Sequence, residues 1–126
     1  MGFLEMFRDW EDVEEYPAKT VIFSERDAAD VMYVVLSGEI ELTLHGESLG
    51  AEGPGGIVGE MAMINSAPRS ATATTLTKVK LARVDRDQFR RFVKENSEFS
   101  LQVMAVLANR LRAVDHYIAT QFKQYN

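Results

Sequence analysis

One glycine-rich segment brings together the residues of this sequence best suited to chemistry. Glycines at positions 53, 55, 56 and 59 precede Glu60, and Pro68 fixes the backbone just before Arg69. Glycine lets a ligand approach the backbone closely. Backbone N–H groups at the start of a short helix, expected over 61–64, form an anion site when an arginine is delivered beside them. A guanidinium matches two phosphate oxygens, and a carboxylate accepts hydrogen bonds from hydroxyls. The segment therefore predicts a site for a ligand with an anion and a sugar-like hydroxyl.

The residues alone leave a simpler interpretation open. A glycine-rich loop with an incidental surface pair between Glu60 and Arg69 has the same composition. Neither G-x-x-x-x-G-K-[ST] nor G-x-G-x-x-G occurs in the segment, so neither general nucleotide fingerprint applies.

Composition limits the class of protein. The chain has 126 residues and is expected to be one domain, 1–126, with a net charge of −5 and no cysteine. The absence of cysteine excludes disulfides, cysteine zinc sites and thiolate catalysis. No apolar run reaches the roughly 18 residues that span a bilayer, and the acidic start is unlike a signal peptide. We therefore expect a cytoplasmic protein without a membrane partner.

Charged and histidine residues argue against two further functions. The basic residues between positions 78 and 94 are interrupted by Asp85 and Asp87, which favours a solvated face over a nucleic-acid patch. A metal-dependent enzyme built on a β-barrel needs clustered histidine and glutamate ligands. His45 and His116 stand in a strand turn and on a helix, so we expect no metal site and no enzyme activity.

Hydrophobic periodicity divides the chain into three parts. Apolar residues at spacings of three and four predict a short N-terminal helix within 1–16, ending before Pro17. Residues 17–84 contain several short candidate strands with turn signals between them, among them the apolar run 31–36 and the alternating run 39–44. This pattern predicts an antiparallel sandwich or barrel. Residues 85–123 return to helical spacing, with Asp85 as N-cap of a first helix. Asn96-Ser97 ends that helix, and Ser97 is expected to cap the second.

The last helix has an apolar stripe wider than one packing surface requires. Its seam has spacings of three and four, and consists of Met104, Leu107, Leu111, Val114 and Ile118. A second row lies beside it, formed by Val103, Val106, Ala113 and Tyr117. The stripe predicts either packing on both the barrel and a second copy of the chain, or a single broad core face.

The segment from Gly59 to Thr72, G-E-M-A-M-I-N-S-A-P-R-S-A-T, resembles the phosphate-binding cassette of cyclic-nucleotide-binding domains of the catabolite-activator and kinase-regulatory-subunit type. Upstream residues 21–23, 27–35 and 37–39 are also similar, and the similarity runs from about residue 16 to about residue 120. The resemblance implies a mainly β fold with flanking helices: an antiparallel β jelly-roll barrel (double-stranded β-helix) at 17–84 with its cassette at 55–72, a short N-terminal helix and two C-terminal helices. The sequence departs from the family at Arg26, where a glycine is usual, and at Val58, where an aromatic is frequent.

The resemblance also implies roles for residues of the cassette. Glu60 takes the ribose 2′-hydroxyl and Arg69 pairs with the cyclic phosphate. The backbone amides of Gly59 and Ala71 and the Ser70 hydroxyl complete the phosphate shell. The remaining expected ligand-binding residues are Met61, Ala62 and Asp115.

The purine is less well specified than the phosphate. Serine at position 70 keeps a hydroxyl that serves either purine, and we favour cAMP over cGMP as the ligand. In catabolite-activator-type relatives a polar residue of the last helix reaches the purine, and the alignment places Val114 and Asp115 there. Asp115 either accepts from an exocyclic amine or is exposed, and Tyr117 either stacks on the base or packs in the core or an interface.

Several functions are compatible with this resemblance. The favoured one is a cyclic-nucleotide sensor that moves its last helix against the barrel, and so signals to an unidentified effector protein or within a homodimer. A dimeric interaction module that kept the fold and lost the ligand is the first alternative. The second is the sensor fragment of a catabolite-activator-type transcription regulator without its DNA-binding domain, since only residues 121–126 follow the last helix.

Overall fold

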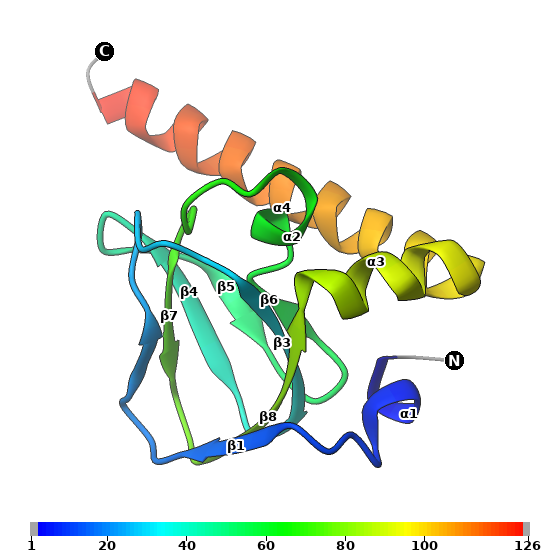
Figure 1. Ribbon diagram of the computed structural model, residues 1–126. Helices are drawn as coiled ribbons and strands as arrows, with labels where there is room; N and C mark the ends of the chain where they lie inside the picture. The colour runs from blue at the N-terminus through cyan, green and yellow to red at the C-terminus, as the bar shows by residue number, and fades with distance from the viewer. Residues whose placement is uncertain (1–2, 125–126) are drawn as a thin grey trace.

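Two four-stranded antiparallel sheets form the body of the molecule in the computed structural model, which describes residues 3–124 and side chains as far as residue 121. The sheets have the strand orders β1-β8-β3-β6 and β2-β7-β4-β5 (Figure 1). The strands are β1 Val13–Tyr16, β2 Val21–Phe23, β3 Val31–Ser37, β4 Ile40–Leu44, β5 Glu47–Glu52, β6 Ile57–Val58, β7 Thr72–Thr75 and β8 Val79–Asp85. The predicted mainly antiparallel β fold with flanking helices is confirmed. The strands form two sheets that do not close into the expected barrel.

The β3 strand is apolar along its length because both of its faces are covered. Val31, Tyr33 and Val35 pack against residues of the second sheet, including Leu42. Met32 and Val34 face the other way and pack with helical residues. A strand buried on both faces is expected to be continuously hydrophobic. In β4 only one face is buried, and there Ile40 and Leu42 alternate with more polar residues as predicted.

The predicted N-terminal helix is correct only at its start. Helix α1 spans Phe3–Phe7, and Val13–Tyr16 form β1, which pairs with β8. The expectation of a helix reaching residue 16 was wrong because an isolated short helix is marginal, whereas β8 offers a strand edge with free backbone groups. The apolar spacing has another use: Phe7 and Trp10 pack on each other, and the Trp10 indole donates to the Arg83 carbonyl at 2.7 Å.

The two C-terminal helices are where the sequence placed them. Helix α3 spans Arg86–Glu95 and α4 spans Ser97–Gln124. Asp85 caps α3 by accepting from the Gln88 amide, and the Gln88 side chain accepts in return from the Asp85 amide. The expectation that Ser97 caps α4 was wrong. Asn96 has that role: its side-chain oxygen accepts from the Phe99 backbone amide at 3.1 Å.

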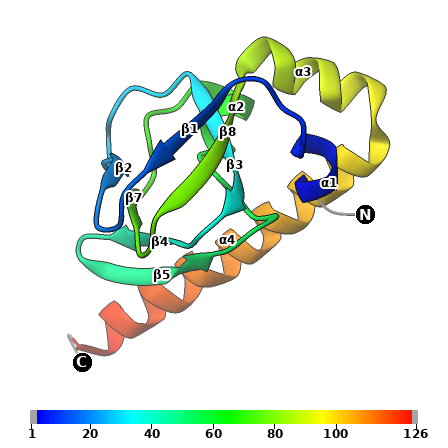
Figure 2. The ribbon, with the colours of Figure 1, turned by 90° about the horizontal axis from the view of Figure 1, so that it is seen from below.

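Helix α4 crosses both the sheets and α2 (Met61–Asn65), as Figures 1 and 2 show. Its apolar stripe is divided between two environments. Val103 is buried and Leu107 and Val114 are partly buried. The seam positions Met104, Leu111 and Ile118 are 61%, 63% and 55% exposed. Ala113, Val106 and Tyr117 of the second row are partly buried, so that row faces the body of the molecule.

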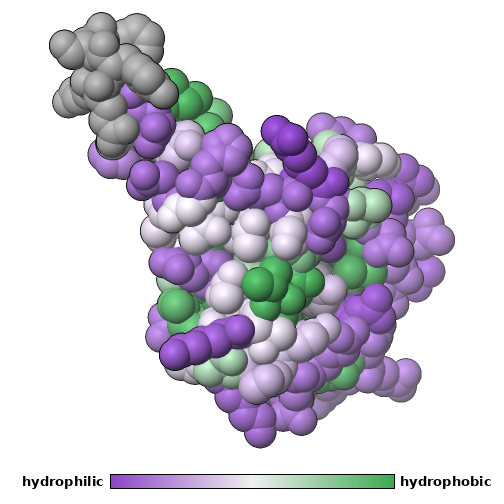
Figure 3. Space-filling view, turned by 90° about the vertical axis from the view of Figure 1, so that its left-hand side faces the viewer, coloured by the Kyte–Doolittle hydropathy of each residue, from purple (hydrophilic) through white to green (hydrophobic). Residues whose placement is uncertain are grey.

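One face of the molecule is mostly polar or of intermediate hydropathy (Figure 3). Figure 3 shows the side of the molecule that carries β2 and β7, where hydrophilic residues surround a small central group of apolar ones. Two of the basic residues between positions 78 and 94 have separate local partners: Arg83 pairs with Asp12 and Glu14, and Arg86 donates to two backbone carbonyls. In the part of the chain that the structure describes, no helix is long and apolar enough to cross a membrane.

Candidate functional site

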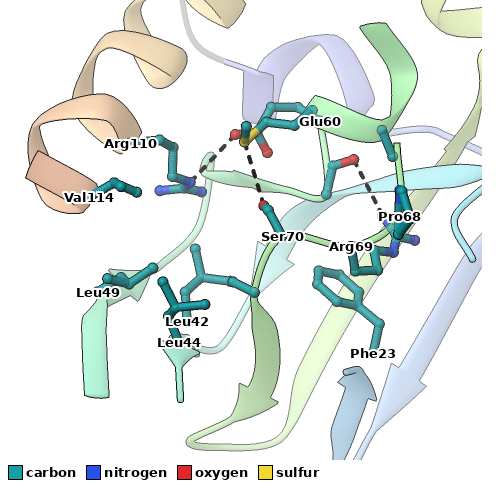
Figure 4. Close-up of a pocket in the computed structure, with 14 residues that line it drawn as sticks. Phe23, Leu42, Leu44, Leu49, Glu60, Pro68, Arg69, Ser70, Arg110 and Val114 are labelled. Atoms are coloured by element: carbon teal, nitrogen blue, oxygen red, sulfur yellow. Dashed lines mark hydrogen bonds and ion pairs between the residues drawn. The ribbon is translucent and has the colours of Figure 1, made fainter. Parts of the chain in front are cut away.

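A hollow lies between the β2-β7-β4-β5 sheet, the cassette and α4 (Figure 4). The empty space within it is about 610 Å³, a volume that includes open solvent at the mouth. Seven of the eight predicted ligand-binding residues line it, and the eighth, Asp115, does not. The lining residues are Phe23, Leu42, Leu44, Leu49, Gly59, Glu60, Met61, Ala62, Pro68, Arg69, Ser70, Ala71, Arg110 and Val114.

Glu60 is a buried carboxylate that the protein leaves partly unsatisfied. Its side chain is 2% exposed, and it does not cap α2 although it stands at the N-cap position. Within the described residues, Oε1 has no hydrogen-bond partner. Burial raises the pKa of Glu60, and the positive charge of Arg110 opposes that rise. A buried polar atom without a hydrogen bond is rare in folded proteins and requires an explanation; here its residue lines the hollow.

Arg69 is the buried cation of the same hollow, with 7% of its surface exposed. Its guanidinium lies 4.1 Å from the centre of the Phe23 ring, and Nη1 donates to the Gly59 carbonyl at 3.3 Å. Gly59 has φ = +80°, and a Cβ there would collide with the guanidinium. Nε has no hydrogen-bond partner among the described residues, and burial lowers the pKa of Arg69.

The loop between β2 and β3 holds the backbone of Arg69 from both sides. Arg26 N–H donates to the Arg69 carbonyl at 2.8 Å, and Arg69 N–H donates to the Asp27 carbonyl at 2.9 Å. Arg26 has φ = +72°, so this arginine itself adopts the left-handed conformation for which glycine is the usual residue. The turn before β3 is therefore built with an arginine in a backbone conformation that carries a steric penalty.

Arg110 is a residue of the site that the sequence argument missed. From α4 its Nε lies 3.4 Å from Glu60 Oε1, and Nη1 lies 2.8 Å from Glu52 Oε1. Its Nη2 donates to the Ile57 carbonyl at 2.7 Å. The sequence does contain one indication that Arg110 belongs to the site. Arg110 precedes Val114 by one helical turn, and residues with this spacing lie on the same face of a helix. Once Val114 is aligned with the ligand, Arg110 is expected on the same side.

The rest of the hollow is largely apolar. Leu42, Leu44, Leu49 and Val114 form one wall (Figure 4). On the cassette side, the Ser70 hydroxyl donates to the Met61 sulfur at 3.6 Å. A wall of this composition suits a flat heterocycle, and the polar groups suit a sugar phosphate.

Three residues of the sequence argument lie outside the hollow. Asp115 is exposed on α4 beside Val114. Tyr117 approaches His45 of the β4–β5 turn, with 3.3 Å between its hydroxyl and Nδ1, so stacking on a base in the hollow is not its observed contact. His116 is exposed on α4. Among the described residues, no group of three potential metal ligands occurs.

Comparison with known proteins identifies the family. Residues 13–96 match the family described as "Cyclic nucleotide-binding domain", which covers both sheets, the cassette and α3. The chain belongs to the cyclic nucleotide-binding domain family. Its buried Glu60 and Arg69 occupy the cassette positions on which the resemblance rests.

Two curated relatives of this domain are regulators. The CRP-like cAMP-activated global transcriptional regulator of Mycobacterium tuberculosis is 30% identical over 110 residues, which is 83% of this chain and 49% of that protein. The cAMP-dependent protein kinase regulatory subunit of Yarrowia lipolytica is 41% identical over 76 residues, which is 59% of this chain and 20% of that protein. The domain thus spans about half the length of the first relative and less of the second.

Solved structures agree with the fold. The catabolite activator protein of Thermus thermophilus superposes with a TM-score of 0.75 and 26% sequence identity, covering 94% of this chain and 58% of that one. This coverage is too large to be confined to the two sheets.

Proposed function

We propose that this domain binds a cyclic nucleotide monophosphate in the hollow beside Glu60 and Arg69 and passes the binding event to α4. One observation carries the proposal. A buried carboxylate and a buried guanidinium line one hollow, and each has a polar atom without a hydrogen-bond partner among the described residues. A ligand with one anion and one hydroxyl satisfies both groups, and an unsatisfied buried charge otherwise destabilises the fold.

In this proposal the ligand lies along the cassette. Arg69 pairs with the cyclic phosphate, and the amides of Gly59 and Ala71 and the Ser70 hydroxyl donate to its oxygens. Glu60 accepts from the ribose 2′-hydroxyl. Met61 and Ala62 lie at the sugar, where their positions on the lining support contact.

The purine is proposed to rest on the wall of Leu42, Leu44, Leu49 and Val114. We favour adenine over guanine, because guanine carries more polar groups on its edge, and an apolar wall leaves them without partners. The curated relatives named above support this preference, since both are described as responding to cAMP. Asp115 is proposed to contact a purine only where a second copy of the chain places it near the ligand, because it does not line its own hollow.

Arg110 is the proposed route from the ligand to α4. It joins that helix to Glu60, Glu52 and the Ile57 carbonyl. A ribose hydroxyl that bonds Glu60 competes with Arg110 for the carboxylate, so the bound and free states favour different positions of α4.

The exposed strip of α4 is the proposed dimer surface. All six positions of a three-and-four repeat are exposed: Leu101, Met104, Ala108, Leu111, Asp115 and Ile118. Such a repeat packs against its counterpart on a second helix. Because the chain spans about half of a transcriptional regulator, the effector that reads this dimer is proposed to be another domain or another protein.

A thermal-shift series tests the ligand directly. Saturating cAMP and cGMP are each compared with AMP, which has the same base as cAMP and no cyclic phosphate. The expected result is a rise in Tm with cAMP, a smaller rise with cGMP and none with AMP, since a ligand of the native state stabilises it in proportion to ln(1 + [L]/Kd). An unchanged Tm with both cyclic nucleotides contradicts the proposal and favours a ligand-free interaction module.

A further inference from the structure

An apolar groove separate from the ligand hollow lies among three helices. Met63 and Ile64 of α2, Phe89 and Val93 of α3, and Val103 and Met104 of α4 contribute to its lining. The groove shares no lining residue with the ligand hollow.

The groove combines a buried floor with exposed apolar edges. Met63, Phe89 and Val103 are 2–5% exposed. Ile64, Val93 and Met104 are 53%, 43% and 61% exposed, and each comes from a different helix. Exposed apolar side chains that converge from separate elements mark an interaction surface more strongly than scattered ones do.

The charge of the rim is opposite to that of the chain. Arg90 and Lys94, one helical turn apart on α3, line the groove. Within residues 3–124 neither forms an ion pair, whereas the chain as a whole has a net charge of −5. Two cations free to pair beside an apolar floor favour an acidic, amphipathic occupant.

We propose that this groove is a docking site for an acidic amphipathic helix of a partner protein. Apolar side chains of the partner at helical spacing fill the floor between Ile64 and Met104, as in other helix-in-groove complexes. Acidic side chains on the flank of that helix pair with Arg90 and Lys94. Met104 also belongs to the proposed dimer strip of α4, so the groove and the strip overlap at this residue.

The groove is joined to the ligand hollow through α2. Met61 and Ala62 line the hollow, while Met63 and Ile64 line the groove. Arg86 at the start of α3 donates to the Ala62 carbonyl at 3.2 Å, which ties the two helices together. A shift of α2 on ligand binding therefore alters the groove. This dependence on nucleotide rests on the proposed function, whereas the docking itself does not.

A pair of synthetic peptides tests the docking. Each is a labelled helix of about five turns with the same leucines at helical spacing, flanked by glutamates in one and by lysines in the other. Fluorescence anisotropy with the full chain is expected to give a Kd for the glutamate peptide at least about tenfold lower than for the lysine peptide. Ile64→Gln and Val93→Gln are each expected to weaken binding about tenfold. Leu76→Gln, which removes a 46% exposed leucine from the turn after β7, is the matched control without effect.

A charge-reversal variant and the addition of cAMP test the electrostatic contacts and the link to the ligand hollow. Arg90→Glu combined with Lys94→Glu is expected to invert the preference between the two peptides. Equal affinity for both peptides, or binding of neither, overturns the proposal. So does a shift of the monomer–dimer equilibrium by Val93→Gln without peptide, because a second copy then covers the groove. Saturating cAMP is expected to change the glutamate peptide's Kd in the wild type and not in Arg69→Ala. If cAMP has no effect while the peptide still binds, the docking site stands and the proposed link to the ligand fails.

Discussion

Arg110 of α4 lies against Glu60 of the ligand hollow, with 3.4 Å between Nε and Oε1. The contact joins residues 50 positions apart in the sequence, from the cassette and the last helix. The Arg110 side chain is 17% exposed and that of Glu60 2%, so the pair is only weakly screened by solvent. It holds α4 on the hollow while leaving Oε1 without a hydrogen bond.

Arg110→Met is expected to lower the free energy of unfolding by about 3 kcal/mol, because removing one partner leaves a buried charge uncompensated. In a Glu60→Gln background, Arg110→Met is expected to cause a smaller loss in the free energy of unfolding, since no buried carboxylate remains at position 60. Urea denaturation of the four proteins near neutral pH measures the coupling. Equal losses in both backgrounds contradict a direct Arg110–Glu60 interaction.

Arg69→Ala is expected to weaken cyclic-nucleotide binding by about 2–5 kcal/mol, since the phosphate is then buried without its cation. Isothermal calorimetry with cAMP measures the loss, and circular dichroism checks that the fold remains. Arg69→Lys is the matched control. Lysine keeps the positive charge but cannot form the bidentate hydrogen bonds of a guanidinium, so this variant is expected to retain part of the affinity. Unchanged affinity in Arg69→Ala contradicts the assignment.

Glu60 is expected to make stability depend on pH in a definite direction. Burial raises the pKa of Glu60 in the folded protein, so the folded state binds its proton more tightly than the unfolded chain does. The resulting stabilisation is complete below the unfolded pKa, about 4.3, and is lost as pH rises through the folded value. The ligand-free wild type is therefore expected to lose stability relative to Glu60→Gln as pH rises from about 4 to about 8.

Denaturation of the two proteins across this range measures the difference. A difference that stays constant, or that changes in the opposite direction, contradicts an elevated pKa at Glu60. Bound cAMP is expected to reduce the dependence on pH, because the ribose hydroxyl stabilises the ionised carboxylate.

Arg26→Gly is expected to stabilise the fold by about 1 kcal/mol, because a side chain in the left-handed region carries a steric penalty that glycine lacks. Arg26 is exposed with φ = +72°, so little packing is lost. Arg26→Ala keeps the strain and removes the side chain, and is expected to leave stability nearly unchanged. Thermal unfolding of the wild type and the two variants measures these differences. A lower Tm for Arg26→Gly than for the wild type contradicts backbone strain at Arg26.

Leu111→Glu is expected to weaken self-association through α4, since it puts a charge at the centre of the exposed strip. Analytical ultracentrifugation over a range of concentrations measures the equilibrium. Ala105→Glu adds the same charge to an exposed position outside the strip and is expected to have a smaller effect. A wild type that stays monomeric at high concentration rules out this dimer.

Much of the fold was predictable from local pattern. The alternation in β4, the continuous apolar run of β3 and the capping residue Asp85 each depend on neighbours in the chain, and all three are confirmed. The N-terminal helix was overextended because strand 13–16 depends on β8, which lies far along the sequence. Periodicity of three and four within 1–16 carries no information about that pairing partner.

In the candidate site, too, some features were predictable from the sequence and others were not. The family and the residues suited to a phosphate and a sugar were readable from one cassette, because these residues lie close together in the chain and their chemistry follows from residue type. Three features required the folded chain: the contact of Arg110 with Glu60, the position of Asp115 outside its own hollow, and the division of the apolar stripe of α4 between the body and the surface. These depend on where a helix crosses two sheets, and that position is set by packing between residues distant in sequence.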